Sequence, residues 1–244
     1  MGCKMQIIEK LTAKQKMYHN KPVTIAFFGD SVTQGCFECY VSSANTVESV
    51  YDYKSAYSTR LREILTILYP NVQVNIINSG ISGDNVKNAR TRIERDVLPY
   101  SPDLVVVSFG LNDSSAQLEG LEDYAENLKY ILNKVAENGA EVIFLTQNAM
   151  NTAVSCHLKE EKIANIAKET MVRQNNGVLK AYMDKAREIA LECGATVCDT
   201  YPIWEKLIKS GVNTTELLSN KINHPIRDWH YYMAIKLLET MFEI

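Results

Sequence analysis

The sequence predicts an α/β protein, a three-layer α/β/α sandwich built on a parallel sheet. Five short apolar runs indicate the strands: residues 23–28, 72–78, 103–109, 141–146 and 195–200. Most of these runs are too continuously apolar for a sheet that has one face in water. Segments with helical periodicity lie between them, and helices long enough to cross over between strands make the strands parallel.

The helices are expected in the following order. Residues 53–68 have apolar side chains at helical spacing, and Pro70 ends that helix. Residues 121–135 and 178–189 show the same period, and Gly194 ends the second of these helices. A final amphipathic helix is expected near the C-terminus.

One domain is expected over residues 1–244, because 244 residues with 46% hydrophobic content can bury a full core and the composition does not shift along the chain. Two stretches, residues 36–49 and 148–177, are longer than a connection requires. Loops of this length usually bind or cover something. Residues 148–177 are therefore interpreted as a lid or an interface insertion, which allows for a homo-oligomer.

The net charge of −3, with acidic and basic residues interleaved, argues against nucleic acid and anionic membranes as partners. The first residues have no signal-peptide core, and no apolar run reaches the length of a membrane span. The chain is expected to be soluble and cytoplasmic.

Six scattered cysteines are typical of reduced thiols in a chain of this size. The "CFEC" stretch, residues 36–39, has neither a second CxxC nor a pair of histidines to complete a zinc site. Asp30, Asp84 and Asp113 are interpreted as helix caps rather than metal ligands. Neither a metal nor a cofactor is expected.

Polar residues and glycines follow the first three strands, where open parallel sheets bind their ligands. "GDSVTQG" places Ser31 after the first strand, and "NSGISGDN" places Gly80 and Gly83 after the second. "GLNDSS" places Asn112 after the third. A serine that cleaves an ester needs a base to take its proton and donors that stabilise an oxyanion, and an asparagine and a glycine amide can be such donors.

The base can be found among four histidines. His19 precedes the first strand, His157 lies in the long tract, and His230 is expected inside the last helix. His224 alone lies in a loop that enters a helix, where Pro225 fixes the backbone after it. His224 is therefore the predicted base.

Taken together, "GDSVTQG", "ISGDN", "GLND" and "HP" resemble the four blocks of the SGNH, or GDSL-type, hydrolase family, in order, over about residues 23–240. The resemblance implies a flavodoxin-like sandwich with Ser31 as nucleophile and His224 as base. It also implies an oxyanion hole made by the Ser31 amide, the Gly83 amide and the Asn112 side chain. Gly83 is chosen over Gly80 because the family's glycine block has the form "ISGD".

The sequence departs from the family at one position. An aspartate normally precedes the histidine by three residues, and Lys221 stands there. The ring of His224 could instead be oriented by Asn220, by a backbone carbonyl near Lys221, or by a distant acid such as Asp199. We expect a Ser31–His224 dyad supported by a backbone carbonyl or by Asn220.

The predicted function is hydrolysis of carboxylic esters through an acyl-enzyme, without a cofactor. "NNGVLKAYMDKAREIA" and "GVNTTELLSNKINHP" look like bacterial members that deacetylate carbohydrates, so acetyl esters of carbohydrates are the expected substrates. The alternatives are a lysophospholipase or thioesterase of the same family, a flavin- or phosphate-binding sandwich, and a non-catalytic carbohydrate-binding relative.

Overall fold

The computed structural model describes residues 5–17 and 19–242 of the chain, and its centre is a five-stranded parallel sheet in the order β4-β1-β5-β6-β7. The strands are β1 (Val23–Gly29), β4 (Val74–Gly80), β5 (Leu104–Ser108), β6 (Glu141–Leu145) and β7 (Thr196–Cys198). Each of the five predicted strands is present, with bounds that shift by a few residues. The order puts β1, which leads to Ser31, beside both β4 and β5.

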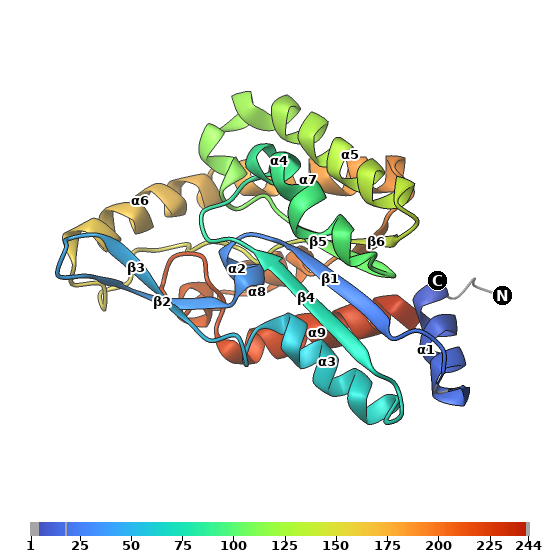
Figure 1. Cartoon of the computed structure of the whole chain (residues 1–244). Helices are drawn as coiled ribbons and strands as arrows, with labels where there is room; N and C mark the ends of the chain where they lie inside the picture. The colour runs from blue at the N-terminus through green and yellow to red at the C-terminus, as the bar shows by residue number, and fades with distance from the viewer. Residues whose placement is uncertain (1–4, 18, 243–244) are drawn as a thin grey trace.

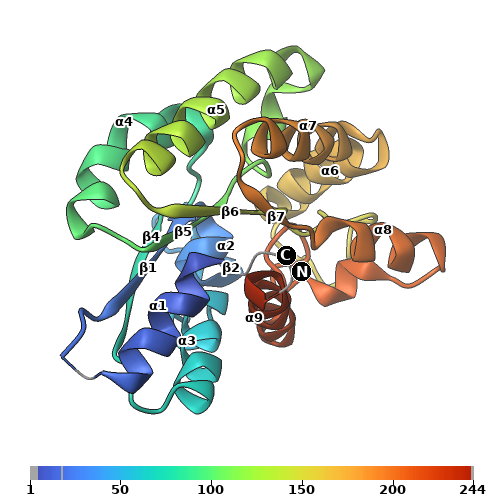
Figure 2. The same ribbon diagram turned by 90° about the vertical axis from the view of Figure 1, so that its right-hand side faces the viewer.

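Helices cover both faces of this sheet (Figures 1 and 2). One face carries α1 (Gln6–Lys16), α3 (Tyr57–Leu68) and α9 (Arg227–Phe242), and the other carries α4 (Val86–Asp96), α5 (Leu121–Glu137) and α7 (Val178–Glu192). The remaining α-helices are α2 (Ser31–Gln34), α6 (Glu161–Asn175) and α8 (Tyr201–Lys209), and the 3₁₀ turns are η1 (Leu98–Tyr100), η2 (Asp113–Ala116), η3 (Leu118–Gly120) and η4 (Thr214–Leu217). The three-layer α/β/α sandwich is confirmed.

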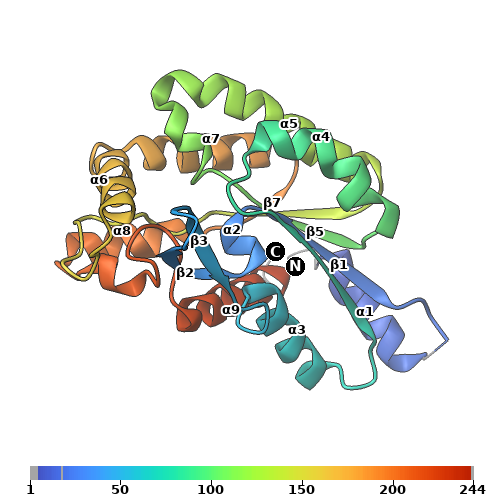
Figure 3. The same cartoon turned by 60° about the vertical axis from the view of Figure 1, so that its left-hand side comes forward.

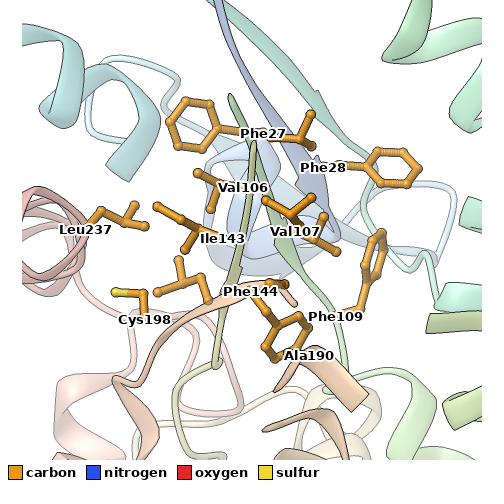
Figure 4. Packing of buried hydrophobic residues seen from close by; sticks show 14 of the residues in the cluster. Phe27, Phe28, Val106, Val107, Phe109, Ile143, Phe144, Ala190, Cys198 and Leu237 are labelled. Atoms are coloured by element: carbon orange, nitrogen blue, oxygen red, sulfur yellow. The ribbon is translucent and has the colours of Figure 1, made fainter. Parts of the chain in front are cut away.

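The core lies between the sheet and its two helical layers (Figure 4). Neighbouring residues of β1 point to opposite faces, so that Phe27 meets Tyr57 of α3 edge-on while Phe28 meets Phe109. Every residue of β5 is buried. Burial on both faces is the reason why the strands read as continuous apolar runs.

Residues 36–49, interpreted from sequence as an overlong connection, form most of a two-stranded antiparallel hairpin. Its strands are β2 (Cys36–Val41) and β3 (Val47–Tyr51). Figure 3 shows the hairpin with α6 and α8 at the end of the sheet where α2 lies. The side chains of β3 are mostly exposed, so this strand lacks the alternation of a half-buried strand.

The long tract 148–177 contains α6, which packs through Ile163 and Ala167 against Ile222 and residues of the hairpin. The tract also bonds the loop that precedes α9: the Asn151 amide donates to the Ile222 carbonyl over 2.8 Å. It therefore buttresses the loop that carries His224. That the tract 148–177 acts as a lid or as an interface between copies of the chain stays a prediction.

Within the described residues the cysteines are free thiols, namely Cys36, Cys39, Cys156, Cys193 and Cys198, while Cys3 lies outside them. None of the helices that the structure describes is both long and apolar enough to cross a membrane. The cytoplasmic location stays a prediction.

Candidate active site

Ser31 begins α2 directly after β1. Asp30 caps this short helix, because its side chain accepts a hydrogen bond of 3.0 Å from the Val32 amide. The other carboxylate oxygen of Asp30 accepts from Nε2 of Gln147 over 2.7 Å. The turn from strand to helix thus places the serine hydroxyl at the carboxyl end of the sheet, with its aspartate neighbour serving as the cap.

His224 meets that hydroxyl. Its Nε2 lies 3.0 Å from Oγ of Ser31, although 193 residues separate the two in sequence. Both side chains are almost fully buried, with 3% of Ser31 and 5% of His224 exposed. The sequence prediction that these two residues come together therefore agrees with the geometry.

The other ring nitrogen of His224 bonds the main chain. Nδ1 lies 2.9 Å from the carbonyl oxygen of Phe37 in β2. A carbonyl oxygen can only accept, so Nδ1 carries the proton and Nε2 is left as the acceptor that faces the serine hydroxyl. The imidazole is held in the tautomer that a general base requires.

This contact corrects the predicted orienting groups. Oδ1 of Asn220 instead accepts the main-chain amides of Ile222, Asn223 and His224 at 2.9–3.0 Å and so shapes the loop. Lys221 has a φ of 58° and forms an ion pair with Glu216.

The distant acid that was considered, Asp199, also bonds elsewhere. Its carboxylate accepts from Oγ1 of Thr146 and from Nε of Arg187, each over 2.8 Å. The predicted backbone carbonyl exists, but it belongs to the hairpin rather than to the loop around Lys221.

Phe37 and its hairpin were missed from the sequence. A signal was available, because the polar residues of "SSAN", 42–45, stand between two runs with β-branched and aromatic residues. Asn45, with a φ of 62°, takes the left-handed conformation that asparagine tolerates in turns. A backbone carbonyl that accepts a hydrogen bond, however, has no sequence signature, since every residue has one.

Burial lowers the pKa of His224 to about 4, and the hydrogen bond to Phe37 and the nearby charge of Glu38 oppose this only in part. The ring is therefore neutral, and able to accept a proton, at all pH values well above 4. The unprotonated form that a general base needs is therefore the form present at neutral pH.

The two glycines that follow β4 differ in what they do. The amide of Gly80 already donates to Oδ1 of Asn78 over 3.0 Å, and a Cβ on Gly80 would lie 2.3 Å from the backbone nitrogen of Gln34. Gly80 thus permits close packing of α2. Gly83 has a φ of +80° in the exposed turn after β4. Gly83 is the better candidate for an oxyanion donor.

Asn112 lies next to that turn. Its Nδ2 donates to the carbonyl of Asp84, the residue after Gly83, over 2.8 Å. An amide nitrogen carries two protons, so the second remains as a possible donor to a ligand. The carboxyl ends of β1, β4 and β5 therefore bring Ser31, Gly83 and Asn112 to one edge of the sheet.

A buried arginine ties these strand ends together. Arg92 of α4 donates to Oδ2 of Asp84 over 2.7 Å, to the carbonyl of Ser79 over 2.7 Å and to the carbonyl of Gly29 over 3.2 Å. Asp84 was expected to cap a helix, but its carboxylate pairs with this guanidinium, since Asn85 takes the cap position of α4. The pair fixes the turn that carries Gly83.

Asp113 reaches across to α4, where it accepts from the amide of Val86 over 2.9 Å. Burial raises the pKa of Asp113 to about 7 and that of Asp30 to about 6. In the part of the chain that the structure describes, no group of three or more His, Cys, Asp or Glu side chains is arranged to hold a metal ion.

The model of the GDSL-like Lipase/Acylhydrolase family matches residues 27–227. The chain belongs to this family. The match includes Ser31, Gly83 and Asn112 after three strands and His224 in the loop before α9. The resemblance inferred from the four sequence blocks is confirmed.

Three relatives have partial sequence matches. An acetylxylan esterase of Geobacillus stearothermophilus is 30% identical over 89 residues, 36% of this chain and 39% of the relative. An uncharacterized lipoprotein of Bacillus subtilis is 29% identical over 126 residues, 47% of this chain and 52% of the relative. An isoamyl acetate-hydrolyzing esterase 1 homolog of Mus musculus is 24% identical over 195 residues, 75% and 68% of the two chains. The chain thus spans about half or less of the first two relatives.

Solved structures share the fold. A two-domain esterase active on acetylated mannans has a TM-score of 0.69 at 20% identity, covering 98% of this chain and 53% of that one. A catalytic mutant of an acetylxylan esterase from Geobacillus stearothermophilus has a TM-score of 0.66 at 20% identity, covering 93% and 98%. The central sheet and its helical layers are therefore those of known esterases.

Proposed function

We propose that the protein is a serine esterase that hydrolyses carboxylic esters through an acyl-enzyme. The observation that carries this proposal is the 3.0 Å contact between Ser31 Oγ and His224 Nε2, with Nδ1 of the same ring held by the Phe37 carbonyl. This arrangement places a neutral acceptor beside the serine hydroxyl, as nucleophilic catalysis requires.

In the first half-reaction, Oγ of Ser31 forms a bond to the ester carbonyl carbon as its proton passes to Nε2 of His224. The negative charge that develops on the carbonyl oxygen is stabilised by the amides of Ser31 and Gly83 and by the Asn112 side chain. The bond to the alcohol then breaks, and His224 returns the proton to the departing oxygen. Ser31 is left as an ester of the acid.

In the second half-reaction, water attacks that ester while His224 takes a proton from the water. The bond to Oγ of Ser31 breaks, the acid departs, and the proton passes from His224 back to Oγ. Each half-reaction needs one base and one oxyanion site, so the same residues perform both.

We propose short acyl groups, acetyl above all, as the acids. The hydroxyl of Ser31 belongs to a residue that is only 3% exposed, which favours a small acyl group over a long chain at the reacting centre. The names of two of the relatives, an acetylxylan esterase and an isoamyl acetate-hydrolyzing esterase homolog, support the same choice.

We propose that the alcohol is a carbohydrate, on the evidence of a polar cleft of about 410 Å³ between α3 and β4. It is lined by Gln34, Tyr53, Ser58, Thr59, Arg62, Ile76, Asn78 and Gly80. Tyr53 is 57% exposed, and its ring stacks on that of Tyr51 with the ring centres 6.1 Å apart. An exposed aromatic ring beside amide, hydroxyl and guanidinium groups can pack on a sugar ring and bond its hydroxyls.

This cleft begins close to the nucleophile. Gln34 is the last residue of α2, whose first residue is Ser31, and a Cβ on Gly35 would lie 3.5 Å from the Cα of Tyr53. Gln34 therefore joins the lining of the cleft to the short helix that begins with Ser31. Most of the side chains that line the cleft are polar, which favours a carbohydrate over a long acyl chain.

The test is a panel of substrates: acetylated xylooligosaccharides, 4-nitrophenyl acetate and palmitate, a lysophospholipid and acetyl-coenzyme A. The proposal predicts turnover of the acetyl esters, with the highest kcat/KM for the oligosaccharides, and loss of that turnover in Ser31→Ala and His224→Ala. Preference for the lysophospholipid or the thioester would favour the alternative members of the family. Equal rates in the unaltered protein and both variants would contradict the proposal.

A further inference from the structure

The group that orients His224 lies on the two-stranded hairpin rather than on the central sheet. The Phe37 carbonyl belongs to β2, which among the described residues pairs with β3 alone, in a separate two-stranded sheet. An isolated two-stranded hairpin is marginally stable. Contacts beyond the hairpin must therefore hold this carbonyl at 2.9 Å from the ring.

Arg227, the first residue of α9, supplies several of these contacts, in addition to the packing of α6 against β2. Its Nη1 and Nη2 donate to the two carboxylate oxygens of Glu38 over 2.6 and 3.1 Å, and its Nε donates to Asp52 over 2.8 Å. Glu38 is the residue after Phe37, and Asp52 directly follows β3. One guanidinium thus joins both strands of the hairpin to the start of α9 and binds Glu38 in bidentate geometry.

The same guanidinium also fixes the side chain of Phe37. The carbon of the Arg227 guanidinium lies 4.3 Å from the centre of the Phe37 ring. On α9, the ring of His230 lies 4.7 Å from that centre, and Phe37 is fully buried. A residue whose ring and following neighbour are both held has little freedom to turn its carbonyl away.

We propose that Arg227 is a positioning residue that clamps the Phe37 carbonyl against Nδ1 of His224. It thereby replaces the aspartate that normally orients the histidine in this family and that this chain lacks. Arg227 follows His224 by three residues, so the loop that carries the base also carries the group that holds the base's partner in place. This inference rests on the proposed function, because it concerns the orientation of the catalytic ring.

The test compares Arg227→Gln with a matched control, Arg90→Gln. Arg90 also stacks on a ring, that of Tyr130 at 4.2 Å, and pairs with a glutamate, and its side chain is 38% exposed, the same fraction as that of Arg227. With 4-nitrophenyl acetate, Arg227→Gln is expected to lower kcat at least tenfold with KM changed less than twofold. Arg90→Gln is expected to keep the kcat of the unaltered protein.

A second measurement separates positioning from folding. The Nδ1 proton of His224, bonded to a carbonyl, should give a slowly exchanging downfield ¹H resonance that persists in Arg90→Gln and is lost in Arg227→Gln. Glu38→Gln should reproduce the fall in kcat, and the double variant should be no worse than Arg227→Gln, because both act through one contact. If Arg227→Gln does not fold, Glu38→Gln, which keeps the pair with Asp52, carries the same test.

The outcomes are distinguishable. The clamp is overturned if folded Arg227→Gln keeps full kcat and an unchanged resonance. If only Glu38→Gln folds, the same result in that variant overturns it. Either result leaves the esterase proposal intact. An unaltered protein that hydrolyses no ester and gives no adduct with a fluorophosphonate overturns the proposed function itself.

Discussion

The acid limb of the pH–rate profile tests the electrostatics of the candidate base. The pKa of His224 is lowered to about 4 by burial. At pH 5 a base with a pKa of about 4 is roughly nine-tenths neutral, whereas one with the ordinary value of 6.5 is only about 3% neutral. We therefore predict that kcat/KM at pH 5 is close to its value at pH 7. The neutral fraction of His224 at pH 5 is about thirtyfold larger than that of an ordinary histidine.

The assay measures acetate released from an acetyl ester between pH 3.5 and 8, because kcat/KM reports the ionisations of the free enzyme. Asp30, whose pKa is raised to about 6, neighbours Ser31 and can add an inflection of its own. Asp30→Asn separates the two, because it removes that inflection and leaves the limb near 4. An acid limb near 6.5 in both proteins would refute the burial argument.

Folding must be followed over the same range. The pKa values of His224 and His230 are lower in the folded chain than in the unfolded one, so their contribution to stability is complete above about 6.5 and declines as the pH falls toward 4 and 3. The raised pKa values of Asp30 and Asp113 act in the opposite direction, favouring the folded chain at low pH and losing that effect as the pH rises toward 6 and 7. Because the two pairs oppose each other, the free energy of unfolding is expected to vary little between pH 4 and 6.

Three further substitutions test other parts of the site. Asn112→Ala should lower kcat about 100-fold with little change in KM, because it removes an oxyanion donor; an unchanged kcat in steady-state assays would exclude that role. Gly80→Ala should lower the free energy of unfolding by about 1–3 kcal/mol in urea titrations, because its Cβ would lie 2.3 Å from the backbone nitrogen of Gln34, and an unshifted midpoint would contradict the packing role. Tyr53→Ala should raise KM for acetylated xylooligosaccharides roughly threefold to tenfold but not for 4-nitrophenyl acetate, whereas the exposed Tyr100→Ala should change neither; equal effects on both esters would remove the cleft from substrate binding.

The central sheet was predictable because burial on both faces requires apolar residues at nearly every position of a strand. β1 and β5 are apolar at almost every position, and such runs separated by helical periods are typical of parallel sheets. The hairpin was not predictable in the same way. β3 packs little of its surface and therefore has no required pattern.

In the candidate site, too, some residues could be predicted from the sequence and others could not. Ser31, Gly83, Asn112 and His224 have side chains or conformations that the chemistry demands, so their residue types mark them in the sequence. The Phe37 carbonyl belongs to the main chain, which leaves its role open to any residue at that position. Arg227 acts through Glu38 and Asp52, and only the folded hairpin brings these three together.

Covalent capture of the nucleophile is the most direct test of the Ser31–His224 dyad. The protein is incubated with a small fluorophosphonate at pH 7, and the adduct is located by peptide mass spectrometry. The dyad predicts one adduct per chain, on Ser31, which forms far more slowly in His224→Ala and is absent in Ser31→Ala. An adduct on another residue, or labelling that proceeds unchanged in His224→Ala, would contradict it.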